Sequence, residues 1–504
     1  MCGITGSWNS QNLRTVKAMT KALVHRGPDG SGITQLGNAV LGHCRLAIMD
    51  PNGGQQPLFT ETTALVANGE IYNWRDLRAS LNREELFRTS SDSEVPLHLL
   101  KANGWTSIDS FDGMYALAYT DGEELILSRD PIGIKPLYFS KQTVGNKQVL
   151  KFASEVKALQ EDGVTLHTLA PGSSWSSLQG TRQHYHLPPA RPEPLHEADA
   201  VRLTRETLER STIKRLMSDV PLGAFLSGGL DSSITAALAK KHLGSLHTFS
   251  VGLENSPDLA AARRVAKHIG SVHHEYLLDP EEIKSDLPNI IYHLESFDED
   301  LMVSAIPCYY VSKLAAQHVK VILTGEGADE LFAGYKYYQT YQDEQALNEE
   351  MRRGVDIMHA VNLQRVDRMT MAHGLEGRVP FLDTEMIKLG FRMPLEHKLR
   401  KANGQTVEKW VLRKAFEDLL PHDIIWRTKS RFDEGTGTLD LMDAVLGNWA
   451  DITGLEAFRT KHPNASLRTA QEAYYYERFR DVFSHPELLL TNVGRWASNR
   501  VGTA

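Results

Sequence analysis

Short apolar runs separated by turn-forming residues dominate the chain up to about residue 185. The runs are bounded by Gly, Asp, Asn or Pro, a pattern typical of β-strands. The clearest of them cover residues 39–42, 64–67, 114–119, 125–127 and 136–139. Helical patterns appear near 13–23 and 94–101. Together these patterns predict an α+β domain of layered antiparallel sheets with helices.

A proline-rich stretch follows this pattern. Four of the eight residues in 187–194 are proline, and such a composition favours an extended, exposed linker. We therefore expect a first domain at 1–186, a linker at 187–196 and a second domain at 197–504.

The second part of the chain alternates between helical and strand patterns. An amphipathic segment at 198–217 is followed by strands at 222–226, 246–253 and 320–324, with helices at 232–242 and 259–269 among them. Strands alternating with helices predict a parallel sheet wrapped by helices. Beyond about residue 340 helical patterns dominate, so we expect an α/β domain with a helical C-terminal part.

The composition fits a large soluble globular protein and argues against some partners. A chain of 504 residues is too long for one ordinary hydrophobic core. Hydrophobic residues make up 41% of it and charged residues 23%. A net charge of −8 argues against a nucleic-acid surface, and no apolar run approaches the roughly 18 residues of a membrane span. Three scattered cysteines and the lack of a signal-peptide pattern lead us to expect a cytoplasmic protein.

Cys2 carries the first candidate chemistry. If Met1 is removed, this residue has both a thiol and a free α-amine, whose ordinary pKa of about 7.7–8.0 lets it act as a base. A base on the same residue removes the thiol proton without a separate histidine. A lone early cysteine is more often an accident of the start, so the interpretation depends on the next hundred residues.

A glycine-rich loop at 227–233 carries the second candidate chemistry. It follows a predicted strand and opens a predicted helix, where backbone amides and the helix dipole attract phosphate. It lacks the Gly-Lys-Ser/Thr ending of a Walker loop. Asp231 would repel phosphate unless a cation bridges the two, which implies Mg²⁺. The plain alternative, a glycine turn with a capping serine, does not account for the strand, helix, hydroxyls and acid together.

An acidic loop at 325–330 also follows a predicted buried strand. Ligands of open parallel sheets bind at the carboxyl ends of strands, so we expect Asp231 and Asp329 to share the metal. Lys429 belongs to a basic cluster at 426–432 that the sequence alone would assign to a solvated loop. The pair His273-His274 is interpreted as ordinary polar residues at a strand end.

The order of these motifs resembles the glutamine-hydrolysing asparagine synthetases, from Cys2 to about residue 480. The first part resembles a class II glutamine amidotransferase domain of the N-terminal-nucleophile hydrolase fold, and the second an ATP-pyrophosphatase synthetase domain. The matching motifs lie at 25–29, 45–48, 68–73, 91–94, 129–130, 153–157, 227–233, 325–330 and 376–383.

The resemblance implies a complete glutaminase site. Cys2 attacks the glutamine amide, while the side chain of Asn68 and the backbone N–H of Gly69 hold the oxyanion. One such donor is typically worth about 2.7–4 kcal/mol. A guanidinium fork suits the glutamine α-carboxylate, and acids suit its ammonium. The glutamine-binding residues would be Arg45, Asn68, Glu70 and Asp92.

The resemblance also implies an ATP site in the second domain. Its residues would be Leu226, Ser227, Gly228, Gly229, Asp231, Ser232, Val251, Thr324 and Gly325. A substrate carboxylate attacks the α-phosphate, and ammonia arriving through an internal, largely apolar passage displaces AMP. Lys429 would neutralise the phosphate charge and Glu326 would assist proton removal from the attacking amine. The partners would be small molecules: glutamine, ATP and aspartate or a related carboxylic acid. The resemblance leaves a homodimer as a possible oligomeric state.

Val303 departs from the pattern, because it occupies the place of an arginine associated with the synthetase reaction. A buried carboxylate facing valine would be unpaired, a penalty of kcal/mol size. Either another cation compensates and aspartate is the acceptor, or the chain amidates a different carboxylic acid. Phosphoribosyl-pyrophosphate and sugar-phosphate amidotransferases share the Cys2 domain but predict a different second half. A non-enzymatic regulatory protein would not need both catalytic sets.

Overall fold

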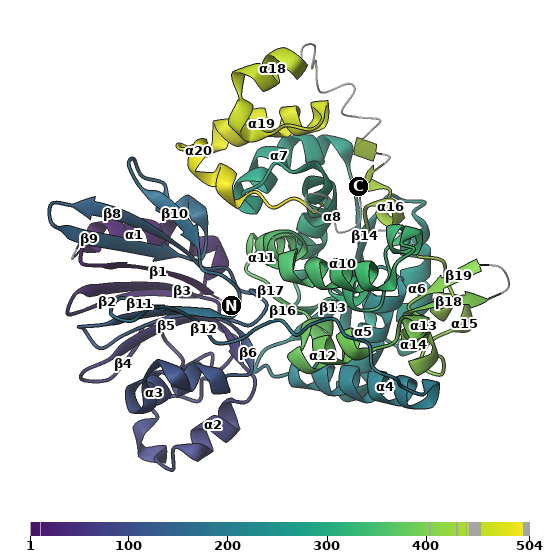
Figure 1. Cartoon of the computed structure of the whole chain (residues 1–504), viewed down its shortest axis with the longest axis horizontal. Helices are drawn as coiled ribbons and strands as arrows, with labels where there is room; N and C mark the ends of the chain where they lie inside the picture. Colours follow the sequence, from purple (N-terminus) through teal and green to yellow (C-terminus); the bar gives the residue numbers. More distant parts are fainter. Residues whose placement is uncertain are drawn as a thin grey trace.

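The computed structural model describes residues 2–10, 12–402, 405–429, 432–439, 441–442 and 455–496. Met1, residues 430–431 of the basic cluster and the end of the second domain lie outside the described residues. Two halves lie side by side in Figure 1, with the purple and blue sheets of the first next to the teal and green helices of the second.

Two six-stranded antiparallel sheets form the first half, in the orders β10-β8-β9-β1-β3-β2 and β12-β11-β7-β6-β5-β4. Ile4, Leu41 and Leu150 from one sheet pack with Val66 and Leu127 from the other in a shared apolar cluster. The strands are β1 (Cys2–Trp8), β2 (Gly30–Leu36), β3 (Ala39–Arg45), β4 (Leu58–Phe59), β5 (Ala64–Ile71), β6 (Gly113–Thr120), β7 (Leu125–Arg129), β8 (Tyr138–Val144), β9 (Lys147–Ala153), β10 (Thr165–Thr168), β11 (Ser173–Ser176) and β12 (Gly180–Gln183).

Helices cover these sheets. Helix α1 (Leu13–Ala22) packs on β1 and β3, while α2 (Trp74–Ser80) and α3 (Glu94–Asn103) lie beside the second sheet, with α3 against β4. Because both faces of β1 and β3 are covered, their residues are buried on both sides rather than alternating. The predicted α+β layered class is confirmed.

A five-stranded parallel sheet, in the order β15-β14-β13-β16-β17, forms the centre of the second half. Its strands are β13 (Leu222–Phe225), β14 (His247–Gly252), β15 (Val272–Leu277), β16 (Val321–Leu323) and β17 (Glu376–Arg378). Helix α4 (Glu197–Lys214) precedes β13, and α5 (Leu230–His242), α6 (Pro257–Ile269), α7 (Pro280–Leu294) and α8 (Glu299–Ala315) connect the strands from β13 to β16. From β13 the chain adds β14 and β15 on one side, and then crosses to add β16 and β17 on the other side. Such a reversal of strand order opens a crevice between β13 and β16 at their carboxyl ends.

Helices dominate the rest of the described chain, and the predicted α/β class with a helical C-terminal part is confirmed. They are α9 (Ala328–Leu331), α10 (Glu344–Ile357), α11 (Asn362–Met371), α12 (Thr384–Arg392), α13 (Leu395–Lys398), α14 (Trp410–Ala415), α15 (His422–Ile425), α16 (Phe432–Thr436), α18 (Leu455–Lys461), α19 (Ala470–Val482) and α20 (Pro486–Leu489). A hairpin of β18 (Leu399–Ala402) and β19 (Gln405–Glu408) interrupts them. The sequence pattern did not indicate this hairpin, which directly precedes Lys409.

Buried ion pairs join the two halves. Arg26 of the first half lies 2.6 Å from Glu155 and 2.8 Å from Asp367, which comes from α11. Arg368, the next residue on α11, lies 3.3 Å from the same Glu155 of the first half. Removing one partner of a buried pair typically costs about 3–5 kcal/mol, so these contacts fix how the two halves meet.

Candidate active sites

Cys2 opens strand β1 at the centre of its sheet. The antiparallel register sets it opposite Arg45 at the end of β3. The Cys2 backbone N–H donates to Oδ1 of Asn68 at 3.0 Å. Burial raises the pKa of the Cys2 thiol, so the thiol needs a base before it can attack.

Asn68 and Gly69 lie together on β5. The Nδ2 group of Asn68 is buried and has no hydrogen-bond partner among the described residues, although such donors are nearly always paired. It is therefore free to donate to a bound oxyanion. Gly69 has φ +141°, and a Cβ there would lie 1.9 Å from the carbonyl oxygen of Met114, so only glycine fits.

The charged residues expected around glutamine lie in the same region. The Arg45 guanidinium donates to the carbonyl oxygens of Met49, Asp50 and Pro51 at 3.3, 2.7 and 3.1 Å. Asp92 is buried and accepts from the backbone N–H of Ile71 at 2.7 Å. Burial raises the pKa of Asp92 to about 6.

Glu70 is placed differently from the other expected residues. Its Oε1 lies 3.2 Å from the guanidinium of Arg378, which closes β17 in the second half. Burial and the nearby carboxylates of Asp92 and Glu376 raise the pKa of Glu70 well above its ordinary value. The side chain therefore connects the Cys2 site to the parallel sheet.

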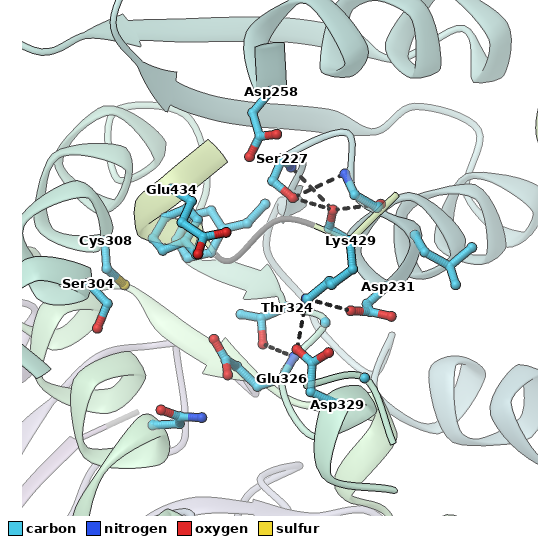
Figure 2. A pocket seen from close by; sticks show the side chains of 18 of the residues that line it. Ser227, Asp231, Asp258, Ser304, Cys308, Thr324, Glu326, Asp329, Lys429 and Glu434 are labelled. Atoms are coloured by element: carbon cyan, nitrogen blue, oxygen red, sulfur yellow. Dashed lines mark hydrogen bonds and ion pairs between the residues drawn. The ribbon is translucent and has the colours of Figure 1, made fainter. Parts of the chain in front are cut away.

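The second site is a cavity of about 520 Å³ at the carboxyl ends of β13, β14 and β16 (Figure 2). It has the size of a small-ligand pocket. Its lining includes the expected residues Leu226, Ser227, Gly229, Asp231, Ser232, Val251, Thr324, Gly325, Glu326, Asp329 and Lys429. Gly228 is not part of the lining. It packs against α6: its φ is +71°, and a Cβ there would lie 2.5 Å from Ala261.

The loop before α5 forms a polar cradle. The Ser227 and Ser232 hydroxyls are 3.0 Å apart, and the Gly229 N–H donates to Ser227 Oγ at 3.3 Å. Gly229 caps the helix, whose first-turn amides point towards the loop. A helix N-terminus flanked by serine hydroxyls suits phosphate.

Asp231 and Asp329 converge, as the sequence predicts, but a lysine bridges them. Lys409 Nζ lies 2.5 Å from Asp231 Oδ2 and 2.6 Å from Asp329 Oδ1. Lys429 Nζ lies 2.8 Å from Asp329 Oδ2, in the arrangement shown in Figure 2. Burial alone would raise the pKa of Asp329, yet the two ammonium groups hold it well below its usual range. The sequence motifs did not indicate Lys409, which lies between the hairpin and α14 with φ +56°.

The same pair of acids fits a divalent cation. Asp231 Oδ1 is buried and accepts no hydrogen bond from the described residues. Mg²⁺ is usually held by one or two carboxylates together with substrate phosphates. An orphaned carboxylate oxygen beside a phosphate cradle meets that requirement.

Glu326 pairs with Arg365 of α11 in the cavity wall. The motifs did not indicate Arg365, because it lies 39 residues further along in a helix. Val303 is buried, and the cavity residues of α8 are Asp300, Leu301, Ser304, Cys308 and Val311. Arg365 therefore brings a guanidinium into the cavity wall, to which Val303 does not contribute.

Comparison with known proteins identifies the family of the chain. A glutamine amidotransferase domain model matches residues 1–172, and an asparagine synthase model matches 203–342 and 339–495. The chain is 38% identical to asparagine synthetase (glutamine-hydrolysing) 2 of Arabidopsis thaliana, over 96% of this chain and 87% of that one. It is 36% identical to the glutamine-hydrolysing asparagine synthetase of Asparagus officinalis, over 96% and 86%.

A solved glutamine phosphoribosylpyrophosphate amidotransferase from B. subtilis is 22% identical over 49% of this chain and 65% of that one. Its TM-score of 0.32 is below the level that shows a shared whole-chain fold. The two matched models define an amidotransferase domain followed by a synthase domain. The chain belongs to the glutamine-hydrolysing asparagine synthetase family.

No helix in the described part of the chain combines the length and apolar character that a membrane crossing needs.

Proposed function

We propose that the chain transfers the amide nitrogen of glutamine to aspartate at the expense of ATP, giving asparagine, glutamate, AMP and pyrophosphate. The observation that carries this proposal is the presence, in one chain, of a buried thiol beside an unpaired amide donor and of a phosphate cradle beside paired acids. The relatives named for the same activity match nearly the whole chain.

In the first step Cys2 attacks the glutamine amide carbon. After removal of Met1 its amine, held by Asn68 Oδ1, accepts the thiol proton and passes it to the leaving ammonia. The tetrahedral oxyanion receives hydrogen bonds from Asn68 Nδ2 and the Gly69 N–H. Water then hydrolyses the thioester to release glutamate. Arg45, Glu70 and Asp92 are the proposed groups for the two charged ends of glutamine.

In the second step the aspartate side-chain carboxylate attacks the α-phosphorus of ATP, and pyrophosphate leaves. Ser227, Gly229 and Ser232 receive the phosphates, while Mg²⁺ held by Asp231 and Asp329 would neutralise part of their charge. Ammonia then attacks the acyl-adenylate, Glu326 takes up its proton, and AMP leaves. Lys429 stabilises the charge on the phosphate.

The acceptor acid is the open part of this proposal. Arg365, buried in the cavity wall beside Glu326, is the cation that would compensate for Val303 and receive a carboxylate of aspartate. A different carboxylic acid is the alternative acceptor that Val303 motivates.

We further propose a glutaminase domain at 1–186, a linker at 187–196 and a synthetase domain at 197–504, all in the cytoplasm. Strand β12 ends at Gln183 and α4 begins at Glu197, which supports this division. A homodimer is the oligomeric state to examine by light scattering.

Incubation with ATP, Mg²⁺, glutamine and aspartate tests the function. Asparagine and pyrophosphate should appear in equal amounts, and each should require aspartate. Pyrophosphate release that responds to another carboxylic acid but not to aspartate would reject aspartate as the acceptor.

An Asn68→Ala variant should lower the glutaminase kcat by about 100- to 1000-fold, because the tetrahedral intermediate loses one oxyanion donor. Ammonia-dependent asparagine synthesis, assayed with ammonium chloride, should stay within about twofold of wild type. An unchanged glutaminase kcat would contradict the role of Asn68.

A further inference from the structure

Three histidines meet at the amino ends of the parallel strands, away from both sites. His247 begins β14, His274 lies within β15, and His318 follows α8. One potential ligand nitrogen from each lies within 4.8 Å of the other two. The parallel register pairs His247 with Val272 and Phe249 with His274, so both histidine side chains point to the sheet face on which α8 packs.

The separations approach those of metal ligands. His247 Nδ1 and His274 Nε2 are 3.0 Å apart, and the His318 ring stacks on His274 with 4.0 Å between ring centres. Two nitrogens bound tetrahedrally to zinc at 2.0–2.1 Å are about 3.3 Å apart. The first pair already has this spacing, and the exposed His318 ring must turn out of its stack on His274 to direct a nitrogen at the same ion.

The surroundings favour a cation with nitrogen ligands. Neutral imidazoles offer lone pairs to a metal ion. The His318 backbone N–H bonds the Ala315 carbonyl at 2.9 Å, so the cluster adjoins the C-terminus of α8, where the helix dipole is negative. Imidazole suits zinc, whereas Mg²⁺ prefers the oxygen ligands of the ATP cavity.

We propose that His247, His274 and His318 bind one Zn²⁺ ion, with water at the exposed fourth position. The proton shared between His247 and His274 moves to the other nitrogen of the same ring, so both histidines stay neutral and each presents a lone pair to the ion. It ties the amino ends of β14 and β15 to the connection between α8 and β16. Under this proposal His274 is a metal ligand, whereas the sequence suggested an ordinary polar residue at a strand end.

Cobalt titration of the chelator-treated full-length protein, followed by visible absorption, tests this site. One Co²⁺ per chain should give the bands of a four-coordinate nitrogen site, without sulfur-to-metal charge transfer, and Zn²⁺ should abolish them. His318→Ala should weaken Co²⁺ binding at least about tenfold, and His274→Gln should do the same. Zn²⁺ should raise the wild-type Tm by a few degrees but not that of His318→Ala.

His186→Ala is the matched control, because His186 is exposed and lies outside the cluster. It should bind Co²⁺ as tightly as wild type. The proposal is overturned if the wild type shows no such band at sub-millimolar Co²⁺, or if both cluster variants keep the wild-type affinity.

Discussion

Replacement of Cys2 by alanine is expected to abolish glutamine-dependent asparagine synthesis, with a loss of at least about a thousandfold. The variant lacks the atom that attacks the amide, and no oxyanion donor can act without a nucleophile. Synthesis from added ammonium should stay within about twofold, because none of the cavity residues at the second site is altered. Asparagine formed from glutamine or from ammonium chloride is the measurement.

Cys44→Ala provides the control, because Cys44 is also buried, on the adjacent strand β3. Burial raises the pKa of its thiol to about 12, and its Sγ is hydrogen-bonded to the Leu23 carbonyl. Both activities should persist in that variant. Glutaminase activity surviving in Cys2→Ala would refute the assignment of the nucleophile.

Lys409→Met is expected to lower ATP-dependent pyrophosphate release by about 100- to 1000-fold while glutaminase activity persists. The lysine bridges Asp231 and Asp329, and removal of one fixed charge beside a reacting phosphate typically costs this much. The buried acids would also lose a counter-charge, so the free energy of unfolding should fall by about 3–5 kcal/mol. Pyrophosphate release, glutaminase rate and the urea midpoint are measured together.

Lys414→Met on α14 is the matched control, since Lys414 pairs with Glu417 and lies outside the cavity lining. It should change pyrophosphate release by less than about twofold. Equal rates in Lys409→Met and wild type would show that the bridge plays no part in the reaction.

Local pattern accounts for much of the fold and of the second site. A strand, a glycine-rich turn and a helix follow one another at 222–242, so the loop position is set by neighbours in sequence. The convergence of the 227–233 and 325–330 loops follows from the order of parallel strands. The three residues of β17 have no clear periodicity, so the sequence indicates them only as part of the motif at 376–383.

Long-range partners could not be predicted from local pattern. Lys409 is 178 residues from Asp231 in sequence, and a single lysine after a hairpin carries no chemical signature. Arg378 reaches Glu70 from the other half of the chain, so an acid expected to face only glutamine also contacts the parallel sheet. Arg365 on α11 belongs to no motif that would connect it to Glu326. Such contacts depend on how the two halves pack.

Transfer of nitrogen inside one molecule is the central claim, and an isotope measurement tests it most directly. The wild-type enzyme is supplied with glutamine labelled with ¹⁵N in the side-chain amide, together with excess unlabelled ammonium, ATP, Mg²⁺ and aspartate. Asparagine should carry mostly ¹⁵N in its amide, because ammonia released at Cys2 reaches the adenylate before it mixes with the solvent. Label diluted to the bulk ammonium ratio would contradict the account.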